Sequence, residues 1–265
     1  ASYLYTGCPV LLGEVIMLLT HAGRVLLVAA LVFILVGPTL AQDEETLADV
    51  VKAECKDFKA TYKKKADEEV TAQIDRLLSM FKDKQADEKV KKEVVSHIAL
   101  AVRLKSDEVA VHALKALGET DAGALKSIEA ALKAALKAKP PTTARYEACF
   151  KALGKIASEK SVKTLTGYLK YKEYDVIARA AAALAQYKGA KGAVRKIVFE
   201  EILKNSEGVY SAAQANENSV PYRKWQVIST DMMDAMNAVS RKEFGDPKAA
   251  RSWWNEVKKK NWDKL

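Results

Sequence analysis

Glycine and proline are scarce in this sequence, with 12 glycines and 6 prolines among 265 residues. Alanine, lysine, leucine and glutamate are abundant instead, and these residues lose little free energy on entering a helix. No run of alternating β-branched residues is long enough to indicate a strand. The composition therefore predicts an all-α protein.

Sequence motifs of catalysis are also lacking. There is no glycine-rich phosphate loop, no nucleophile-elbow motif and no Cys-x-x-Cys. His97 and His112 have no carboxylate or cysteine that the sequence alone places at ligand spacing, and pairs such as Asp231 and Asp234 fall on polar helix faces. We predict a non-catalytic protein without cofactor, catalytic or metal-binding residues.

Long apolar runs are absent except near the N-terminus. Residues 25–36 are uninterruptedly apolar, Arg24 precedes them, and small residues follow up to Ala41. This is the pattern of a secretory signal peptide, and the run is shorter than the roughly 20 residues that span a bilayer. We expect residues 1–41 to be cleaved off, leaving a periplasmic or secreted protein without stable membrane insertion. Residues 1–16 precede Met17, and we interpret them as spurious or upstream of the true start.

Three segments share one pattern of small and large apolar residues: 109–118, 145–154 and 176–185. Their anchor leucines, Leu117, Leu153 and Leu184, are spaced by 36 and then 31 residues, and a second amphipathic stretch follows each segment. A period of this size built from two helices indicates a helical solenoid, in which stacking buries what a single pair could not.

The pattern resembles HEAT repeats, in particular the short bacterial kind whose first helix ends in Ala-Leu-Gly. The resemblance is clear over residues 107–205 and fainter over 67–105 and 221–260. It implies an armadillo-like α-solenoid of about five HEAT-like helical pairs over residues 67–245, preceded by an amphipathic helix within 42–66. The family's usual Val-Arg opening is missing from all three segments, so a lyase-type enzyme related to the phycobilin lyases is only a remote alternative.

Residues 246–265 form a tryptophan-rich end. All four tryptophans, Trp225, Trp253, Trp254 and Trp262, fall within the last 41 residues. With the preceding Gly-x-Asp-Pro turn, the segment resembles the end of exported planctomycete-type HEAT-repeat proteins. Large aromatic side chains suit a cap over the exposed end of a solenoid, and we predict this role. A platform for sugars or peptides is the alternative.

Cysteine is rare, with Cys55 and Cys149 as the two that follow the predicted cleavage point. Cys55 continues an apolar helical stripe from Val51, and Cys149 occupies the small-residue position of Ala113 and Ala180 in the repeats. We predict two separate buried thiols, although an exported protein could also join them in a disulfide.

Acidic residues are outnumbered in the middle of the chain. The net charge is +9, and residues 106–205 contain 18 basic and 11 acidic side chains. The HEAT resemblance implies that second helices line a concave binding face, and their basic residues form the predicted partner-binding stripe: Lys126, Lys133, Lys137, Lys163, Lys170, Lys191, Arg195 and Lys196.

Together these features predict a protein-binding scaffold in the cell envelope. Its partner is expected to be a protein, with an anionic envelope polymer or lipid head group as the alternative. Export argues against nucleic acid. The competing interpretation of the basic residues is a solvated face that only keeps the protein soluble.

Overall fold

The structure is a computed structural model that describes residues 46–64 and 66–265. The predicted signal peptide lies outside these residues. Leu47–Leu265 forms one compact unit. Its described residues fold into α-helices, short 3-10 turns and loops, without a strand, which confirms the all-α prediction. None of these helices combines the length and apolar character needed to cross a membrane.

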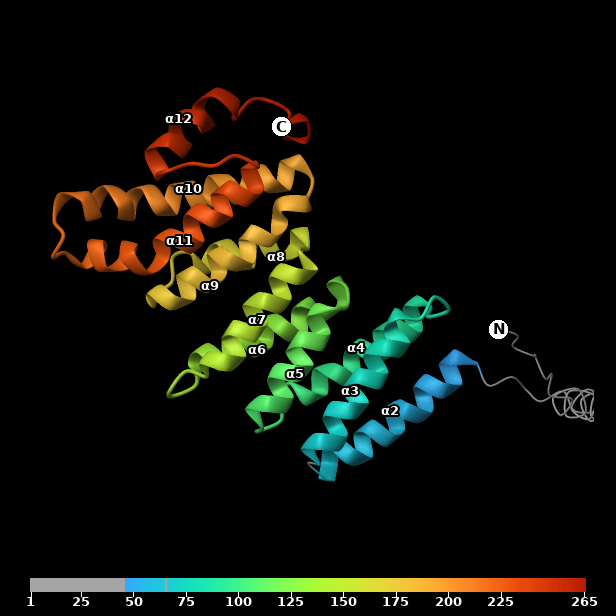
Figure 1. The fold of residues 1–265 in the computed structure, drawn as a ribbon. Helices are drawn as coiled ribbons and strands as arrows, with labels where there is room; N and C mark the ends of the chain where they lie inside the picture. Colours follow the sequence, from blue (N-terminus) through green and yellow to red (C-terminus); the bar gives the residue numbers. More distant parts are fainter. Residues whose placement is uncertain (1–45, 65) are drawn as a thin grey trace, which may run out of the picture. The chain divides into compact units, whose positions relative to one another are not determined.

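Eleven α-helices follow one another in the described part of the chain (Figure 1). Their bounds are α2 Leu47–Lys64, α3 Asp67–Lys82, α4 Glu88–Ala101, α5 Asp107–Gly118, α6 Leu125–Lys137, α7 Thr143–Ile156, α8 Glu159–Tyr168, α9 Tyr174–Ala185, α10 Gly192–Ala215, α11 Val220–Ser240 and α12 Pro247–Val257. Three 3-10 turns, η1 Ala122–Ala124, η2 Gln186–Gly189 and η3 Trp262–Lys264, complete the set.

The odd-numbered and even-numbered helices occupy different positions in the stack. The odd-numbered helices from α3 to α11 each pack on the next odd-numbered one, and each is followed by an even-numbered helix. This is the stacking of a HEAT-like solenoid and confirms the predicted fold class. The last pair is irregular, because α12 packs on α10.

Local sequence signals set several helix starts. The Asp87 carboxylate accepts a hydrogen bond from the backbone N–H of Val90 at 2.7 Å and caps α4. Asp246 does the same for α12 through the N–H of Ala249 at 2.8 Å, with Pro247 in the first turn. Such caps satisfy backbone donors that the helix itself leaves unpaired.

The repeat positions are the centre of the core. Leu117, Leu153 and Leu184 are fully buried. At Gly118 an added Cβ would lie 2.9 Å from the Cα of Ala152, so the end of α5 touches the backbone of α7. Gly154 repeats this contact, because a Cβ there would lie 2.9 Å from the carbonyl oxygen of Ala183 on α9. Glycine thus permits close backbone packing at both positions.

The aromatic end of the chain gathers around Phe199 of α10. The rings of Trp253, Trp254 and Trp262 lie 5.3 to 5.5 Å from the Phe199 ring, centre to centre. Trp254 and Trp262 are buried. Trp225 is elsewhere, half-buried beside Tyr210, with ring centres 5.3 Å apart. The three C-terminal tryptophans therefore cover the apolar surface of α10.

Candidate functional site

Six of the predicted binding residues have exposed side chains. Lys126, Lys133 and Lys137 lie on α6, Lys163 and Lys170 on or just after α8, and Lys191 directly before α10. Within residues 46–64 and 66–265, no carboxylate forms an ion pair with any of the six. Their ammonium groups are therefore free to meet an external anion.

Arg195 does not belong to this set, and its prediction as a surface binding residue is corrected by its burial. The side chain is 1% exposed and donates from Nη1 to the carbonyl of Val239 at 3.0 Å. Its Nη2 donates to the carbonyl of Trp262. Lys196 is half-buried, with its Nζ 5.9 Å from the centre of the Trp254 ring. Both cations lie against the C-terminal aromatic cluster.

The helices that carry the six lysines are neighbours. The hydroxyl of Thr164 on α8 donates to the Glu129 carboxylate on α6 at 2.7 Å, and α8 also contacts α10. Second helices of successive pairs thus lie next to each other. Lys126 and Lys133 flank Glu129 on α6, and Lys163 is adjacent to Thr164 on α8.

A groove of about 390 Å³ runs along α6 between α4, α5 and the start of α7. Its walls are mainly alanine side chains and methylene groups, with two arginines and few other polar groups. The residues that line it are Ala99, Val102, Arg103, Leu114, Ser127, Ala130, Ala131, Ala134, Ala135, Ala138, Thr142 and Arg145. A second hollow of about 620 Å³, between α4 and η1, shares Ser127 with it.

The lysines of α6 lie along one edge of the groove and do not line it. Ala130 lines the groove and lies four residues after Lys126 and three before Lys133, so the three side chains project in similar directions. Arg103 is exposed at the same groove. Cations therefore border an apolar channel of small side chains.

Arg145 fixes one wall of the groove. Its Nε donates to the Asp107 carboxylate at 2.6 Å, and its Nη2 donates to the carbonyls of Leu104 and Lys105 at 2.8 and 2.9 Å. One guanidinium thus holds the connection between α4 and α5 against the start of α7. The segment 145–154 begins with Arg145 in place of the family's Val-Arg opening, and this local pattern did not predict the clamp.

The groove itself was not predicted from the sequence. Its signal was present in the alanines of α6, which recur at spacings of three and four residues. Alanine favours helix in any setting, so this pattern alone indicates only a helix. The groove exists because α4 and α7 pack beside α6.

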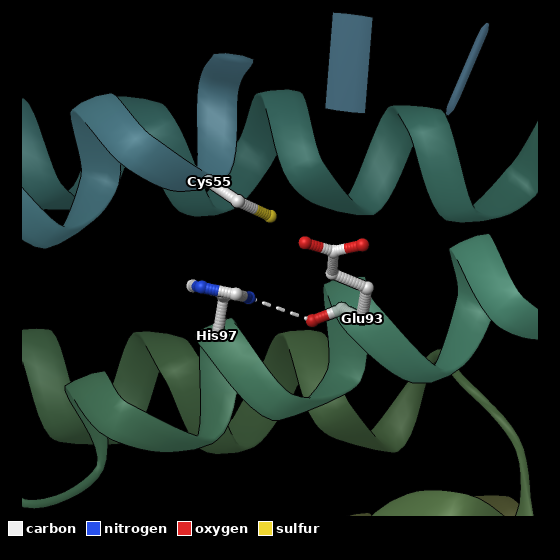
Figure 2. Close-up of side chains that lie close together, drawn as sticks. All are labelled: Cys55, Glu93 and His97. Carbon is white, nitrogen blue, oxygen red and sulfur yellow. Dashed lines mark hydrogen bonds between the residues drawn. The ribbon is translucent and has the colours of Figure 1, made fainter. Parts of the chain in front are cut away.

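A second cluster joins Cys55 of α2 with Glu93 and His97 of α4 (Figure 2). Sγ of Cys55, a carboxylate oxygen of Glu93 and a ring nitrogen of His97 all lie within 4.8 Å of one another. The expectation that His97 lacks a carboxylate or cysteine at ligand spacing is therefore wrong. It is also wrong for His112, whose Nε2 lies 2.7 Å from the Asp75 carboxylate.

Both cysteines of the described chain are free and buried, as predicted. Burial raises the pKa of the Cys149 thiol to about 12. Burial and the neighbouring Glu93 carboxylate raise the pKa of Cys55 to about 12 as well. Both thiols are therefore protonated at neutral pH, and neither is an activated nucleophile.

Residues 94–186 match the protein-family model of HEAT repeats. This supports a HEAT-repeat protein. HEAT repeats generally mediate protein–protein interaction. The matched stretch begins within α4 and ends after α9, and so includes α6 and the groove along it.

No curated protein matches the sequence. Among solved structures, the crystal structure of an engineered protein is similar, with 17% sequence identity and a TM-score of 0.34, covering 79% of this chain and 95% of the other.

Proposed function

We propose that this HEAT-repeat protein is a non-catalytic scaffold that binds a protein segment in the groove along α6. The observation that carries the proposal is the groove itself, an alanine-lined channel of about 390 Å³ bordered by unpaired lysines. Apolar walls with few polar groups are typical of surfaces that recognise an amphipathic helix.

The chemistry of the groove defines its partner. Alanine side chains let another backbone approach closely, so the partner's buried face should carry small or medium apolar residues. Lys126, Lys133 and Arg103 at the edge favour carboxylates on the partner's flanks. The proposed partner is therefore an acidic amphipathic segment of another protein.

Filling the groove tests this proposal. Ala134 is exposed and lines the channel, so Ala134→Trp should block entry while leaving the buried core in place. Ala72→Trp, at an exposed position on α3, is the matched control. Proteins captured from the native envelope fraction by the wild type should be lost with Ala134→Trp and retained with Ala72→Trp. Equal capture by all three proteins would refute the groove as the binding site.

A lysine variant separates the groove from the wider basic face. Lys133, Lys137, Lys163 and Lys170 are changed together to glutamine, with Lys52, Lys56, Lys259 and Lys260 as exposed controls. If carboxylate flanks are steered by the lysines, the first variant should lower the association rate constant by about tenfold at low salt, and the control should not. Added salt should reduce this difference.

The alternative is an anionic envelope polymer or lipid head group bound by the lysines alone. Their lack of ion-pair partners within the described residues favours this second candidate. It predicts that the fourfold lysine variant abolishes capture of the polymer while Ala134→Trp has no effect.

We further propose that the scaffold acts outside the cytoplasm, after cleavage following Ala41. Support comes from the sequence of residues 24–41, which precede the described part of the chain. N-terminal sequencing of the protein from its native host should find Gln42 at or near the first position. Recovery of the intact apolar segment from the membrane fraction would contradict export by this route.

A further inference from the structure

The cluster of Cys55, Glu93 and His97 joins two helices at a buried point. Figure 2 shows the Cys55 thiol pointing from α2 toward the Glu93 carboxylate and the His97 ring, both of which belong to α4. Cys55 is 2% and His97 is 5% exposed, whereas Glu93 is only partly buried and reaches the surface. Cys55 and His97 are therefore shielded from solvent, whereas Glu93 is accessible to it.

The His97 ring is oriented by a hydrogen bond from one nitrogen. Its Nδ1 lies 2.8 Å from the backbone carbonyl oxygen of Glu93, one turn earlier on α4. A carbonyl oxygen only accepts, so Nδ1 carries the proton of the neutral ring and Nε2 carries a lone pair. This arrangement, with one nitrogen anchored to a carbonyl, is typical of histidines that bind a metal through the other.

The lone pair on Nε2 has no hydrogen-bond donor within the described residues. Nε2 is buried, and no residue in the described ranges hydrogen-bonds to it. The Phe58 ring lies beside the His97 ring, with ring centres 6.3 Å apart and planes at 89°. A buried nitrogen without a hydrogen-bond partner is destabilising, so such an atom calls for a specific explanation.

We propose that Cys55, Glu93 and His97 bind one zinc ion. One sulfur, one nitrogen and one oxygen are the three donor types that proteins offer Zn²⁺. The mixed set disfavours Mg²⁺ and Ca²⁺, which take oxygen ligands, and Zn²⁺ tolerates all three donors without a preferred geometry of its own. Three protein ligands leave the fourth tetrahedral position for water or an external donor.

Binding converts the Cys55 thiol to a thiolate. The zinc–sulfur bond replaces the S–H bond, and the proton leaves to solvent, with no change in oxidation state. The ion gives the Nε2 lone pair of His97 a partner and offsets the negative charges of the thiolate and the Glu93 carboxylate. It also links α2 directly to α4, which resists separation of the N-terminal helix from the repeats.

Cobalt titration of the full chain tests this site. Reduced, metal-free protein is titrated with Co²⁺, whose bond to a thiolate gives a near-ultraviolet charge-transfer band and whose tetrahedral complexes absorb intensely in the visible. The wild type should show both features at one equivalent, and Zn²⁺ should abolish them by displacement. Absence of the charge-transfer band from the wild type would refute the site.

The chain supplies matched controls. Cys149 is the other buried thiol and His112 the other histidine of the described chain, so Cys149→Ala and His112→Gln should keep the band. Cys55→Ala should lose it. Loss of the band with Cys149→Ala but not with Cys55→Ala would overturn the assignment.

Two further variants keep the test decisive if Cys55→Ala fails to fold, as judged by circular dichroism. Glu93→Gln and His97→Gln should each keep the thiolate but weaken Co²⁺ binding by at least about tenfold, since loss even of a supporting partner costs about 10–100-fold. Glu93 is partly exposed, so its replacement leaves the core intact. Unchanged affinity in both variants would exclude these residues as ligands.

Discussion

The guanidinium of Arg195 lies 5.9 Å from the centre of the Trp262 ring and also donates a hydrogen bond to the Trp262 backbone carbonyl. One buried cation thus holds the last tryptophan by its ring and by its main chain. The same side chain reaches the carbonyl of Val239 at 3.0 Å, so it joins α10 both to α11 and to the C-terminal segment.

Replacing Arg195 by methionine should destabilise the protein by about 2–4 kcal/mol, because two buried carbonyls lose their donor. The measurement is urea-induced unfolding followed by circular dichroism. Lys204→Met, at an exposed position of the same helix, should change the free energy of unfolding by less than about 0.5 kcal/mol. Equal stability of the two variants would show that the Arg195 contacts contribute nothing net.

Two glycines of α10 should respond oppositely to alanine. A Cβ at Gly192 would lie 2.5 Å from the backbone nitrogen of Asp263, so Gly192→Ala should displace the C-terminal segment and lower the melting temperature. A Cβ added at Gly208 would have no atom within 4 Å apart from its chain neighbours and the backbone of its own helix turns. Gly208→Ala should therefore stabilise the helix by about 0.4–1 kcal/mol. A melting temperature that rises in both variants would contradict the close contact at Gly192.

Removal of residues 246–265 tests the predicted cap. A chain that ends at Gly245 loses the three tryptophans around Phe199 and exposes the apolar surface of α10. We expect aggregation in size-exclusion chromatography and a broader thermal transition. A chain that lacks only the exposed Leu265 should behave like the wild type. If the shorter chain stays monomeric with unchanged melting, ligand binding becomes the better account of the tryptophans.

Asp231 should make stability depend on pH. Burial raises the pKa of its carboxyl, an effect that Asp234 reinforces and Arg179 opposes. A raised pKa in the folded state gives stability that is present in acid and is lost as pH rises through the folded pKa. Asp231→Asn should therefore gain stability over the wild type from acidic to neutral pH, whereas Glu217→Gln, at an exposed position, should not. Urea titrations at several pH values measure this; a constant difference would refute the shift.

The helices and their repetition follow from the residue pattern alone. Leu117, Leu153 and Leu184 recur at a helical-pair period, and their burial follows from that period, because an apolar stripe on a helix must pack against a neighbour. The burial of Cys149 and Ala180 was equally predictable, since both occupy a small-residue position within that stripe.

Which polar side chains come together depends on how the helices pack in three dimensions. Arg195 follows a polar pattern in its own helix, yet it is buried because a carbonyl 67 residues later docks on it. Cys55 meets Glu93 and His97 because α2 packs on α4, and Ala130 borders a groove because α4 and α7 stand beside α6. Helix periodicity depends on neighbours three or four residues apart, whereas these contacts depend on how whole helices stack, which no local pattern specifies.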